Sequence, residues 1–142
     1  MENIASHNRR ALVVDDDEDI RNALVDSLTL RGYYCVAADN GASALLCLDA
    51  ERFHLVVTDY RMPTMDGIQF LEALKQHPPH DLPPVILLTA DMSEELRRQA
   101  LELGAYAVIA KPFASQELTA LSARAIESRE IGRSGLSEMR GH

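Results

Sequence analysis

Six polar side chains stand at the ends of four short apolar runs of the sequence, and their types suit chemistry on a phosphoryl group. The set consists of Asp15, Asp16 and Asp17 after "ALVV", Asp59 after "HLVVT", Thr89 at the end of "PVILLT", and Lys111 after "AYAVIA". Three carboxylates brought close together repel one another, and a hard divalent cation relieves that repulsion. Oxygen ligands alone suit Mg²⁺ or Mn²⁺ better than zinc, which prefers histidine or cysteine. A hydroxyl and an ammonium group beside such a metal would bind an anion, so the set favours phosphoryl transfer.

These side chains can meet only if the apolar runs are strands of one sheet. Each run is short and rich in β-branched or aromatic residues, which is typical of strands. The expected strands are residues 11–14, 33–38, 54–58, 84–89 and 105–110. Helical patterns alternate with them at residues 20–31, 41–51, 66–76, 93–103 and 115 to about 129. This alternation predicts a doubly wound α/β fold, a five-stranded parallel sheet with helices on both faces. Open sheets of this kind bind ligands beyond the carboxyl ends of their strands.

The composition limits the class of protein. Aspartate and glutamate number 22 against 14 lysines and arginines, which gives a formal net charge of -8. This charge disfavours binding of nucleic acid or of an anionic membrane surface by this segment. No apolar run approaches the ~20 residues of a membrane span, and "MENIASHNRR" lacks the apolar core of a signal peptide. We therefore expect one cytoplasmic domain.

Four motifs stand at the ends of the expected strands. They are "VVDDDEDIR", "LVVTDYRMPTMDG", "ILLTA" and "AKPF", in this order. Together they resemble the receiver domain of bacterial two-component response regulators, over most of the chain. The resemblance implies a flavodoxin-like sheet with strand order 2-1-3-4-5. It also implies a phosphoacceptor rather than an enzyme, with at most self-phosphorylation and self-dephosphorylation activity, which receives its phosphoryl group from a sensor histidine kinase or a phosphotransfer protein.

The same resemblance implies a role for each acidic position. Asp59 matches the phosphoacceptor, whose carboxylate attacks the phosphorus of a phosphohistidine and becomes an acyl phosphate. Asp16 and Asp59 match direct ligands of Mg²⁺, together with the backbone carbonyl of Arg61. Asp15 matches a ligand that acts directly or through a coordinated water. Lys111 matches the residue that pairs with the phosphoryl group.

Two further positions complete the implied site. Thr89 matches the switch residue, whose hydroxyl moves toward a phosphoryl oxygen and biases the nearby loop and helix between two packings. Pro112 matches a position that follows a cis peptide bond. The remaining acids of the first motif, residues 17–19, lie outside the metal pair. We expect them to stabilise the positive N-terminal end of the first helix.

The sequence departs from the family pattern at one switch position. The family commonly has tyrosine or phenylalanine three residues before the lysine, where this chain has Val108. Tyr106 lies two residues earlier on the same strand, ~6.6 Å away along the chain, so we do not expect it to replace the missing aromatic ring. We expect weaker or different coupling between Asp59 and the surface of the fourth helix, fifth strand and fifth helix.

Two charged residues flank the expected site. Arg61 lies two residues after Asp59, and Asp91 lies two residues after Thr89. We expect an ion pair between Arg61 and Asp91 across the pocket. Such a pair would screen the acyl phosphate from water and lengthen its lifetime.

We divide the chain into a leader at residues 1–10, a receiver domain at 11–129 and a flexible C-terminal tail at 130–142, which contains glycines and no apolar periodicity. The domain acts either alone or as part of a longer regulator, through a downstream protein or an attached output domain that the sequence does not identify. The resemblance also suggests a homodimer through the surface of the fourth helix, fifth strand and fifth helix, with Arg97 and Leu101 as contributors.

Two other functions remain open at this stage. A Mg²⁺-dependent phosphohydrolase of α/β fold needs the same metal and carboxylates. Haloacid-dehalogenase-like phosphatases have a second acid two residues after the nucleophile, a position held by Arg61 after Asp59 and by Asp17 after Asp15. The other alternative is a constitutive interaction module with the receiver fold, which the complete set of site residues disfavours.

Overall fold

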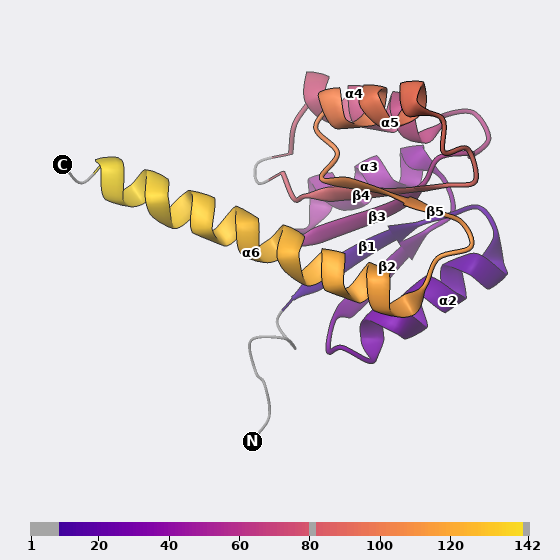
Figure 1. Ribbon diagram of the computed structural model, residues 1–142, viewed down its shortest axis with the longest axis horizontal. Coiled ribbons are helices and arrows are strands. Elements are labelled where there is room, and N and C mark those ends of the chain that lie inside the picture. Colours follow the sequence, from indigo (N-terminus) through magenta and orange to yellow (C-terminus); the bar gives the residue numbers. More distant parts are fainter. Residues whose placement is uncertain (1–8, 80–81, 141–142) are drawn as a thin grey trace.

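The computed structural model describes residues 9–79 and 82–140, and its centre is a parallel sheet of five strands (Figure 1). The strands are β1 Arg10–Val14, β2 Tyr34–Ala38, β3 Leu55–Asp59, β4 Val85–Thr89 and β5 Ala107–Ala110. The helices between and after them are α2 Glu18–Thr29, α3 Gly41–Ala50, α4 Gly67–Gln76, α5 Glu94–Glu102 and α6 Ser115–Arg140. The sheet has the order β2-β1-β3-β4-β5. Both the predicted fold class and the predicted strand order are confirmed.

The helices form a layer on each face of the sheet, because alternate residues of the central strands point to opposite faces. On one face, Leu12 and Val14 of β1 pack in a buried cluster with side chains of α3, α4 and α5. On the other face, Ala11 and Val13 pack in a second cluster with side chains of α2 and α6. Figure 1 shows the same division, with α3, α4 and α5 above the sheet and α2 and α6 below it.

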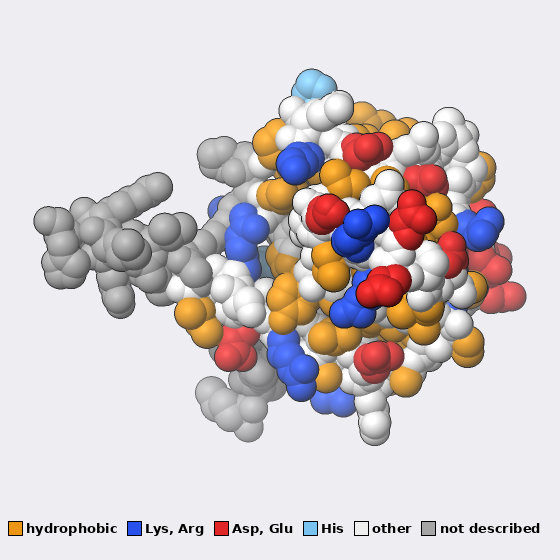
Figure 2. Space-filling view, turned by 45° about the horizontal axis from the view of Figure 1, so that its top comes forward, with side chains coloured by type: hydrophobic (Ala, Val, Ile, Leu, Met, Phe, Trp, Pro, Cys, Tyr) orange, Lys and Arg blue, Asp and Glu red, His pale blue; other side chains and the backbone are white. Residues whose placement is uncertain are grey.

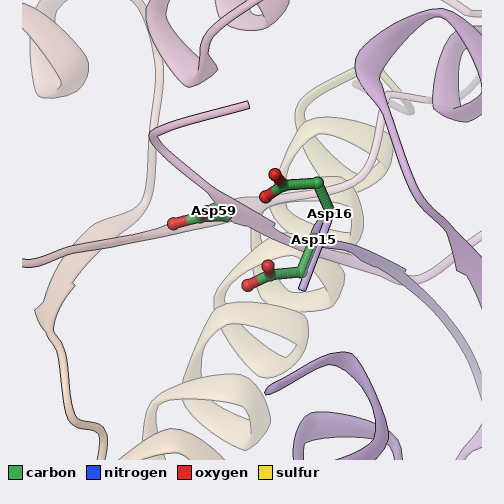
Figure 3. Close-up of side chains that lie close together, drawn as sticks. All are labelled: Asp15, Asp16 and Asp59. Atoms are coloured by element: carbon green, nitrogen blue, oxygen red, sulfur yellow. The ribbon is translucent and has the colours of Figure 1, made fainter. Parts of the chain in front are cut away.

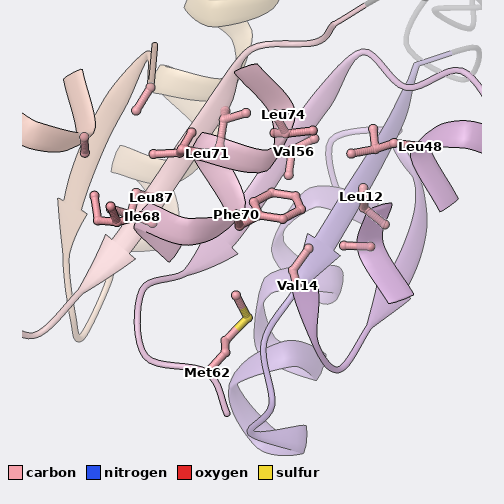
Figure 4. Close-up of a cluster of buried hydrophobic side chains, with 14 of the residues drawn as sticks. Leu12, Val14, Leu48, Val56, Met62, Ile68, Phe70, Leu71, Leu74 and Leu87 are labelled. Carbon is pink, nitrogen blue, oxygen red and sulfur yellow. The ribbon is translucent and has the colours of Figure 1, made fainter. Parts of the chain in front are cut away.

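Phe70 of α4 lies within the first cluster (Figure 4). It is fully buried, and it is the largest of the side chains that are almost completely shielded from solvent. Leu12, Val14 and Val56 of the sheet lie around its ring, and Leu71 and Leu74 of the same helix lie beside it. This packing fixes α4 against the strands that carry the acidic residues.

Polar side chains define where the helices begin. Asp17 accepts hydrogen bonds from the backbone N–H groups of Asp19 and Ile20, so it caps α2 as the sequence predicted for this part of the acidic run. Asp66 and Gln69 form a reciprocal capping box at the start of α4. These hydrogen bonds satisfy backbone N–H groups in the first turns of α2 and α4 and so stabilise the starts of both helices.

The last helix is longer than the sequence analysis predicted. We expected it to end near residue 129 and residues 130–142 to form a tail, but α6 continues to Arg140 and extends beyond the sheet (Figure 1). Gly132 and Gly135 each cost about 1 kcal/mol in a helix interior, but no proline interrupts the segment. The glycines were therefore given too much weight. Of the leader predicted at residues 1–10, residues 1–8 lie outside the described residues, as do 141–142, and Arg10 already belongs to β1.

Among the residues that the structure describes, no helix combines the length and the apolar character that crossing a membrane requires. This agrees with the absence of long apolar runs in the sequence.

Candidate functional site

The polar residues predicted to bind the metal and the phosphoryl group lie at the carboxyl ends of the strands. Asp59 is the last residue of β3, and Thr89 is the last residue of β4. Asp15 and Asp16 follow β1 directly, and Lys111 follows β5. Because β1 lies beside β3 and β3 beside β4, the parallel register brings these ends to one edge of the sheet.

Three carboxylates meet at this edge (Figure 3). Asp15, Asp16 and Asp59 can each offer one oxygen such that all three oxygens lie within 4.8 Å of one another. Asp15 is completely buried and Asp59 is 5% exposed, whereas Asp16 is exposed to solvent. The cluster therefore has a fixed inner side and an outer side that water can reach.

Asp15 is held through both its backbone and its carboxylate. Its backbone N–H donates to the carbonyl of Ala38 on β2 at 3.1 Å. Its Oδ1 accepts from the backbone N–H of Asp17 at 2.9 Å, and its Oδ2 lies 3.3 Å from Nζ of Lys111. Burial raises the pKa of Asp15, with a further increase from the charge of Asp59, and the contacts with Asp17 and Lys111 only partly offset this.

Lys111 connects the two buried acids. Its Nζ lies 2.8 Å from Oδ1 of Asp59 and 3.3 Å from Oδ2 of Asp15. Burial lowers the pKa of Lys111, but the carboxylates of Asp59 and Asp15 outweigh burial, and the net pKa is raised. The ammonium is therefore charged at neutral pH, and it lies close enough to Asp59 to pair with an anion attached to that side chain. The peptide bond between Lys111 and Pro112 is cis, as the resemblance implied.

Thr89 is buried, and its hydroxyl is engaged with the loop that follows β4. Its Oγ1 accepts a hydrogen bond from the backbone N–H of Asp91 at 2.9 Å and donates to the backbone carbonyl of Asp91 at 3.3 Å. The hydroxyl thus makes local contacts within the loop that leads to α5. A group that attracted this hydroxyl would have to compete with both hydrogen bonds.

The ion pair predicted between Arg61 and Asp91 is absent from the ion pairs of the described residues. The guanidinium of Arg61 lies over the ring of Tyr60, with its Cζ 6.0 Å from the ring centroid. Oδ1 of Asp91 accepts from the backbone N–H of Ser93, the residue that caps α5. The prediction was wrong because each side chain finds a partner close to it in the sequence.

Val108 occupies the position where the family commonly has an aromatic residue. It is partly buried and packs against the cluster formed by α3, α4 and α5. Its strand partner is Leu87, two residues before Thr89. Tyr106 is 36% exposed and precedes the first residue of β5. The weaker coupling expected from Val108 stays a prediction.

Sequence reasoning missed one contact of the acidic cluster. Nη1 of Arg21, in the second turn of α2, donates to the backbone carbonyl of Asp15 at 2.8 Å. A positive residue six positions after the first acid was a visible signal. The sequence did not show where the side chain of Arg21 points, because its guanidinium could equally have reached solvent or one of the neighbouring acids.

Two surface hollows lie beside the cluster. One is lined by Asp16, Arg61 and neighbouring residues of the loop after β3. The other is mainly apolar and is lined by Ile20 and Ala23 of α2 together with Lys111 and the residues after it. The acidic cluster is therefore accessible to small molecules from the side of Asp16, and an apolar surface adjoins Lys111.

Gly67, the first residue of α4, allows the chain to approach β3 closely. Its N–H donates to the carbonyl of Tyr60 at 2.7 Å. A Cβ at this position would lie 2.5 Å from Cδ1 of Leu87, 3.0 Å from Cα of Tyr60 and 3.1 Å from the carbonyl oxygen of Asp59. Two of these three atoms belong to the backbone next to the site.

We expect Gly67→Ala to lower the free energy of unfolding by about 1–3 kcal/mol, as overpacking does, and to weaken metal binding because it displaces the backbone at Asp59. Urea unfolding and a Mg²⁺ titration measure the two effects. Gly104→Ala is the matched control, because Gly104 has a φ of 102° and no atom within 4 Å of an added Cβ. It should lose stability by backbone strain and keep its Mg²⁺ affinity. Equal Mg²⁺ affinity in Gly67→Ala and wild type would contradict the prediction.

The amino-acid sequence of the chain is similar to those of several known proteins. A family model described as the response regulator receiver domain matches residues 11–123. The response regulator protein FleR of Pseudomonas aeruginosa is 40% identical over 115 residues, which are 81% of this chain and 24% of FleR. The probable chemotaxis protein CheY of Rhizobium etli is 37% identical over 112 residues, which are 78% of this chain and 87% of that protein.

A solved structure has the same fold. The CheY-like response regulator receiver domain protein from Methanospirillum hungatei superimposes with a TM-score of 0.80 at 28% identity. The match covers 87% of this chain and 98% of that one. The chain thus corresponds to nearly the whole of some similar proteins, whereas it spans only about a quarter of the length of FleR.

Proposed function

Because the chain belongs to the response regulator receiver domain family of two-component systems, we propose that it accepts a phosphoryl group on Asp59. The donor is a phosphohistidine of a sensor histidine kinase or of a phosphotransfer protein. The observation that carries this proposal is the contact of 2.8 Å between Asp59 Oδ1 and Lys111 Nζ beside two further carboxylates. That arrangement provides a nucleophile, a positive charge for the arriving anion and ligands for a metal.

The transfer is a single displacement at phosphorus. A carboxylate oxygen of Asp59 forms the new bond to phosphorus, the bond between phosphorus and the histidine nitrogen breaks, and its electron pair stays on the imidazole. Lys111 then moves its contact from the carboxylate to a phosphoryl oxygen. The hydroxyl of Thr89 exchanges its hydrogen bonds with the backbone of Asp91 for one with the phosphoryl group.

The donor set fits Mg²⁺. Asp15, Asp16 and Asp59 offer oxygens only, and exposed Asp16 leaves room for water ligands, which Mg²⁺ usually keeps. These residues, with the backbone carbonyl of Arg61 as a further ligand, would hold the ion. When bound, Mg²⁺ would neutralise charge on the phosphoryl oxygens. Without it, Lys111 is the one cation within ion-pair distance of these acids among the described residues.

The output of the proposed switch is a change of surface. The loop after Thr89 leads directly into α5, so movement of the hydroxyl is expected to alter the surface of α5, β5 and α6. Leu101 is 39% exposed there, and Arg97 is also exposed. Figure 2 shows acidic, basic and apolar side chains interspersed on the side of the molecule where α4 and α5 lie. The surface of α5, β5 and α6 is the proposed site of homodimer formation or of contact with a downstream protein.

Two broader expectations belong to the same proposal. This chain matches only 24% of the length of FleR, and we propose that its output comes from an attached output domain or from a separate partner protein. A cytoplasmic location, predicted from the sequence, is proposed as well.

The proposal is tested by mass spectrometry of the protein incubated with Mg²⁺ and acetyl phosphate. We expect a single phosphoryl adduct on the wild type and none on Asp59→Asn, whose amide is not a nucleophile. Asp66→Asn is the matched control, because asparagine preserves the cap of α4 and the charge change is the same. It should be labelled as the wild type is.

The two alternatives give different results in the same assay. Continuous hydrolysis of a phosphomonoester would indicate the Mg²⁺-dependent phosphohydrolase. Neither labelling nor turnover, with Mg²⁺ shown to bind, would indicate the constitutive interaction module.

A further inference from the structure

The carbonyl of Asp15 marks the point where the chain leaves β1 and turns toward α2. Its peptide plane joins Asp15 to Asp16, so the orientation of this one carbonyl affects the directions of both side chains. Every other contact of Asp15 described above involves its N–H or its carboxylate. The side-chain contact of this carbonyl is the hydrogen bond that it accepts from Arg21.

Arg21 makes this contact in acidic surroundings. Asp16, Asp17, Glu18 and Asp19 are all close to it in sequence. No ion pair joins Arg21 to any of them among the described residues. Arg21 is half-buried, and the hydrogen bond of 2.8 Å has the short length typical of a charged donor. The guanidinium is thus held at the backbone of the turn and does not lie among the carboxylates.

From this geometry we propose that Arg21 is a positioning residue for the cation site: through the carbonyl of Asp15 it holds the carboxylates of Asp15 and Asp16 in the arrangement that binds Mg²⁺. The inference rests on the proposed function, because it concerns the metal that function requires. Arg21 itself contacts neither the cation nor the phosphoryl group. Groups that orient metal ligands in this way typically change metal affinity about 10- to 100-fold when removed.

Because Arg21 is positively charged, the direction in which the Mg²⁺ affinity changes on its removal distinguishes two possible roles. If Arg21 acted only as a nearby positive charge, its removal would strengthen Mg²⁺ binding, because a cation would no longer repel the metal. If Arg21 orients the ligands, its removal weakens Mg²⁺ binding despite the lost repulsion. The two roles therefore predict changes of affinity in opposite directions.

The experiment measures the Mg²⁺ dissociation constant by calorimetric titration of the full chain, for the wild type, Arg21→Met, Arg21→Lys and Arg31→Met. We expect the dissociation constant of Arg21→Met to rise about 10- to 100-fold. Arg21→Lys should restore part of the affinity, because the ammonium keeps the charge and a donor. Arg31→Met is the matched control, because Arg31 is an exposed arginine just beyond the end of the same helix. Its affinity should equal that of the wild type.

A second measurement separates positioning from a general loss of structure. Labelling with acetyl phosphate is followed over a range of Mg²⁺ concentrations. The half-saturating Mg²⁺ concentration of Arg21→Met should rise by the same factor as its dissociation constant, while the rate at saturating Mg²⁺ stays near that of the wild type. If circular dichroism shows that Arg21→Met is unfolded, Arg21→Lys decides the question, because it keeps the charge and changes the geometry. A Mg²⁺ affinity weaker than that of the wild type would support the orienting role. An affinity equal to that of the wild type would contradict it.

The outcomes are distinguishable from a failure of the proposed function. Wild type that neither binds Mg²⁺ nor becomes labelled would contradict the proposed function itself. Wild type that binds Mg²⁺ and becomes labelled, together with unchanged or tighter binding by a folded Arg21→Met, would contradict only the role given to Arg21.

Discussion

An Asp15→Asn variant is expected to be more stable than the wild type when no divalent cation is present, and to lose most of its response to Mg²⁺. Asp15 is completely buried, and its carboxylate lies near those of Asp16 and Asp59, with one ammonium to offset them. Asparagine has nearly the same shape and can still accept the hydrogen bond from the N–H of Asp17. The substitution therefore removes a buried charge and leaves the turn intact.

The expected gain in stability follows from the raised pKa of Asp15. Burial makes the ionised form less favourable in the folded protein than in the unfolded chain, where the pKa is near its ordinary value of 3.8. Ionisation of Asp15 thus lowers stability above its folded pKa, and the penalty disappears below 3.8, where both states are protonated. The gain in Asp15→Asn should be present at neutral pH and should vanish in acid.

Thermal unfolding with increasing Mg²⁺ measures both effects. The wild-type midpoint should rise with Mg²⁺, because a ligand that binds only the folded state stabilises it by about 2.7 kcal/mol at 100 times its Kd. Asp15→Asn should start higher and change little, since loss of a metal ligand should weaken binding by at least the ~10- to 100-fold seen for outer-shell groups.

Asp17→Asn is the control for Asp15→Asn. It removes the same charge two residues away, and asparagine caps helices about as well as aspartate. Its response to Mg²⁺ should match the wild type. An Asp15→Asn variant with an undiminished Mg²⁺ shift would show that Asp15 is not part of the cation site.

Phe70→Ala is expected to produce the largest loss of stability, about 3–5 kcal/mol. Its ring is fully buried at the contact between α4 and the sheet (Figure 4). Removing it takes apolar surface from the core and leaves a cavity between a helix and the strands, where neither can move without breaking other contacts. Since small domains are stable by only about 5–15 kcal/mol, this variant should be close to unfolding.

Urea unfolding of Phe70→Ala and Leu46→Ala provides the comparison. Leu46 belongs to α3, which covers the same face of the sheet, but it is 69% exposed. Its replacement should change stability by no more than about 0.5 kcal/mol. A loss below ~1 kcal/mol for Phe70→Ala would contradict the prediction, because it would mean that the surrounding core relaxes to fill the cavity.

The sequence contained enough information for the fold and for the main residues of the candidate site. Strand-sized apolar runs alternate with helical patterns, and a parallel sheet between helix layers buries both. Polar residues placed directly after those runs had to meet at one edge, because parallel strands all end on the same side. Asp15, Asp16, Asp59 and Lys111 were predicted by this reasoning together with the family resemblance. The three carboxylates have oxygens within 4.8 Å of one another, and Lys111 lies within ion-pair distance of Asp15 and Asp59.

Only the tertiary structure decided where the long and flexible side chains point. Arg61 was expected to pair with Asp91, but it lies over Tyr60, while Asp91 accepts a hydrogen bond from the backbone N–H of Ser93. Arg21 was not assigned a role, although its guanidinium binds the carbonyl of Asp15. A side chain with several rotatable bonds can reach many partners at similar cost, and the three-dimensional arrangement of backbone groups selects one of them. Strand ends have no such freedom, which is why the sequence alone determined the acidic cluster and the tertiary structure determined what holds it in place.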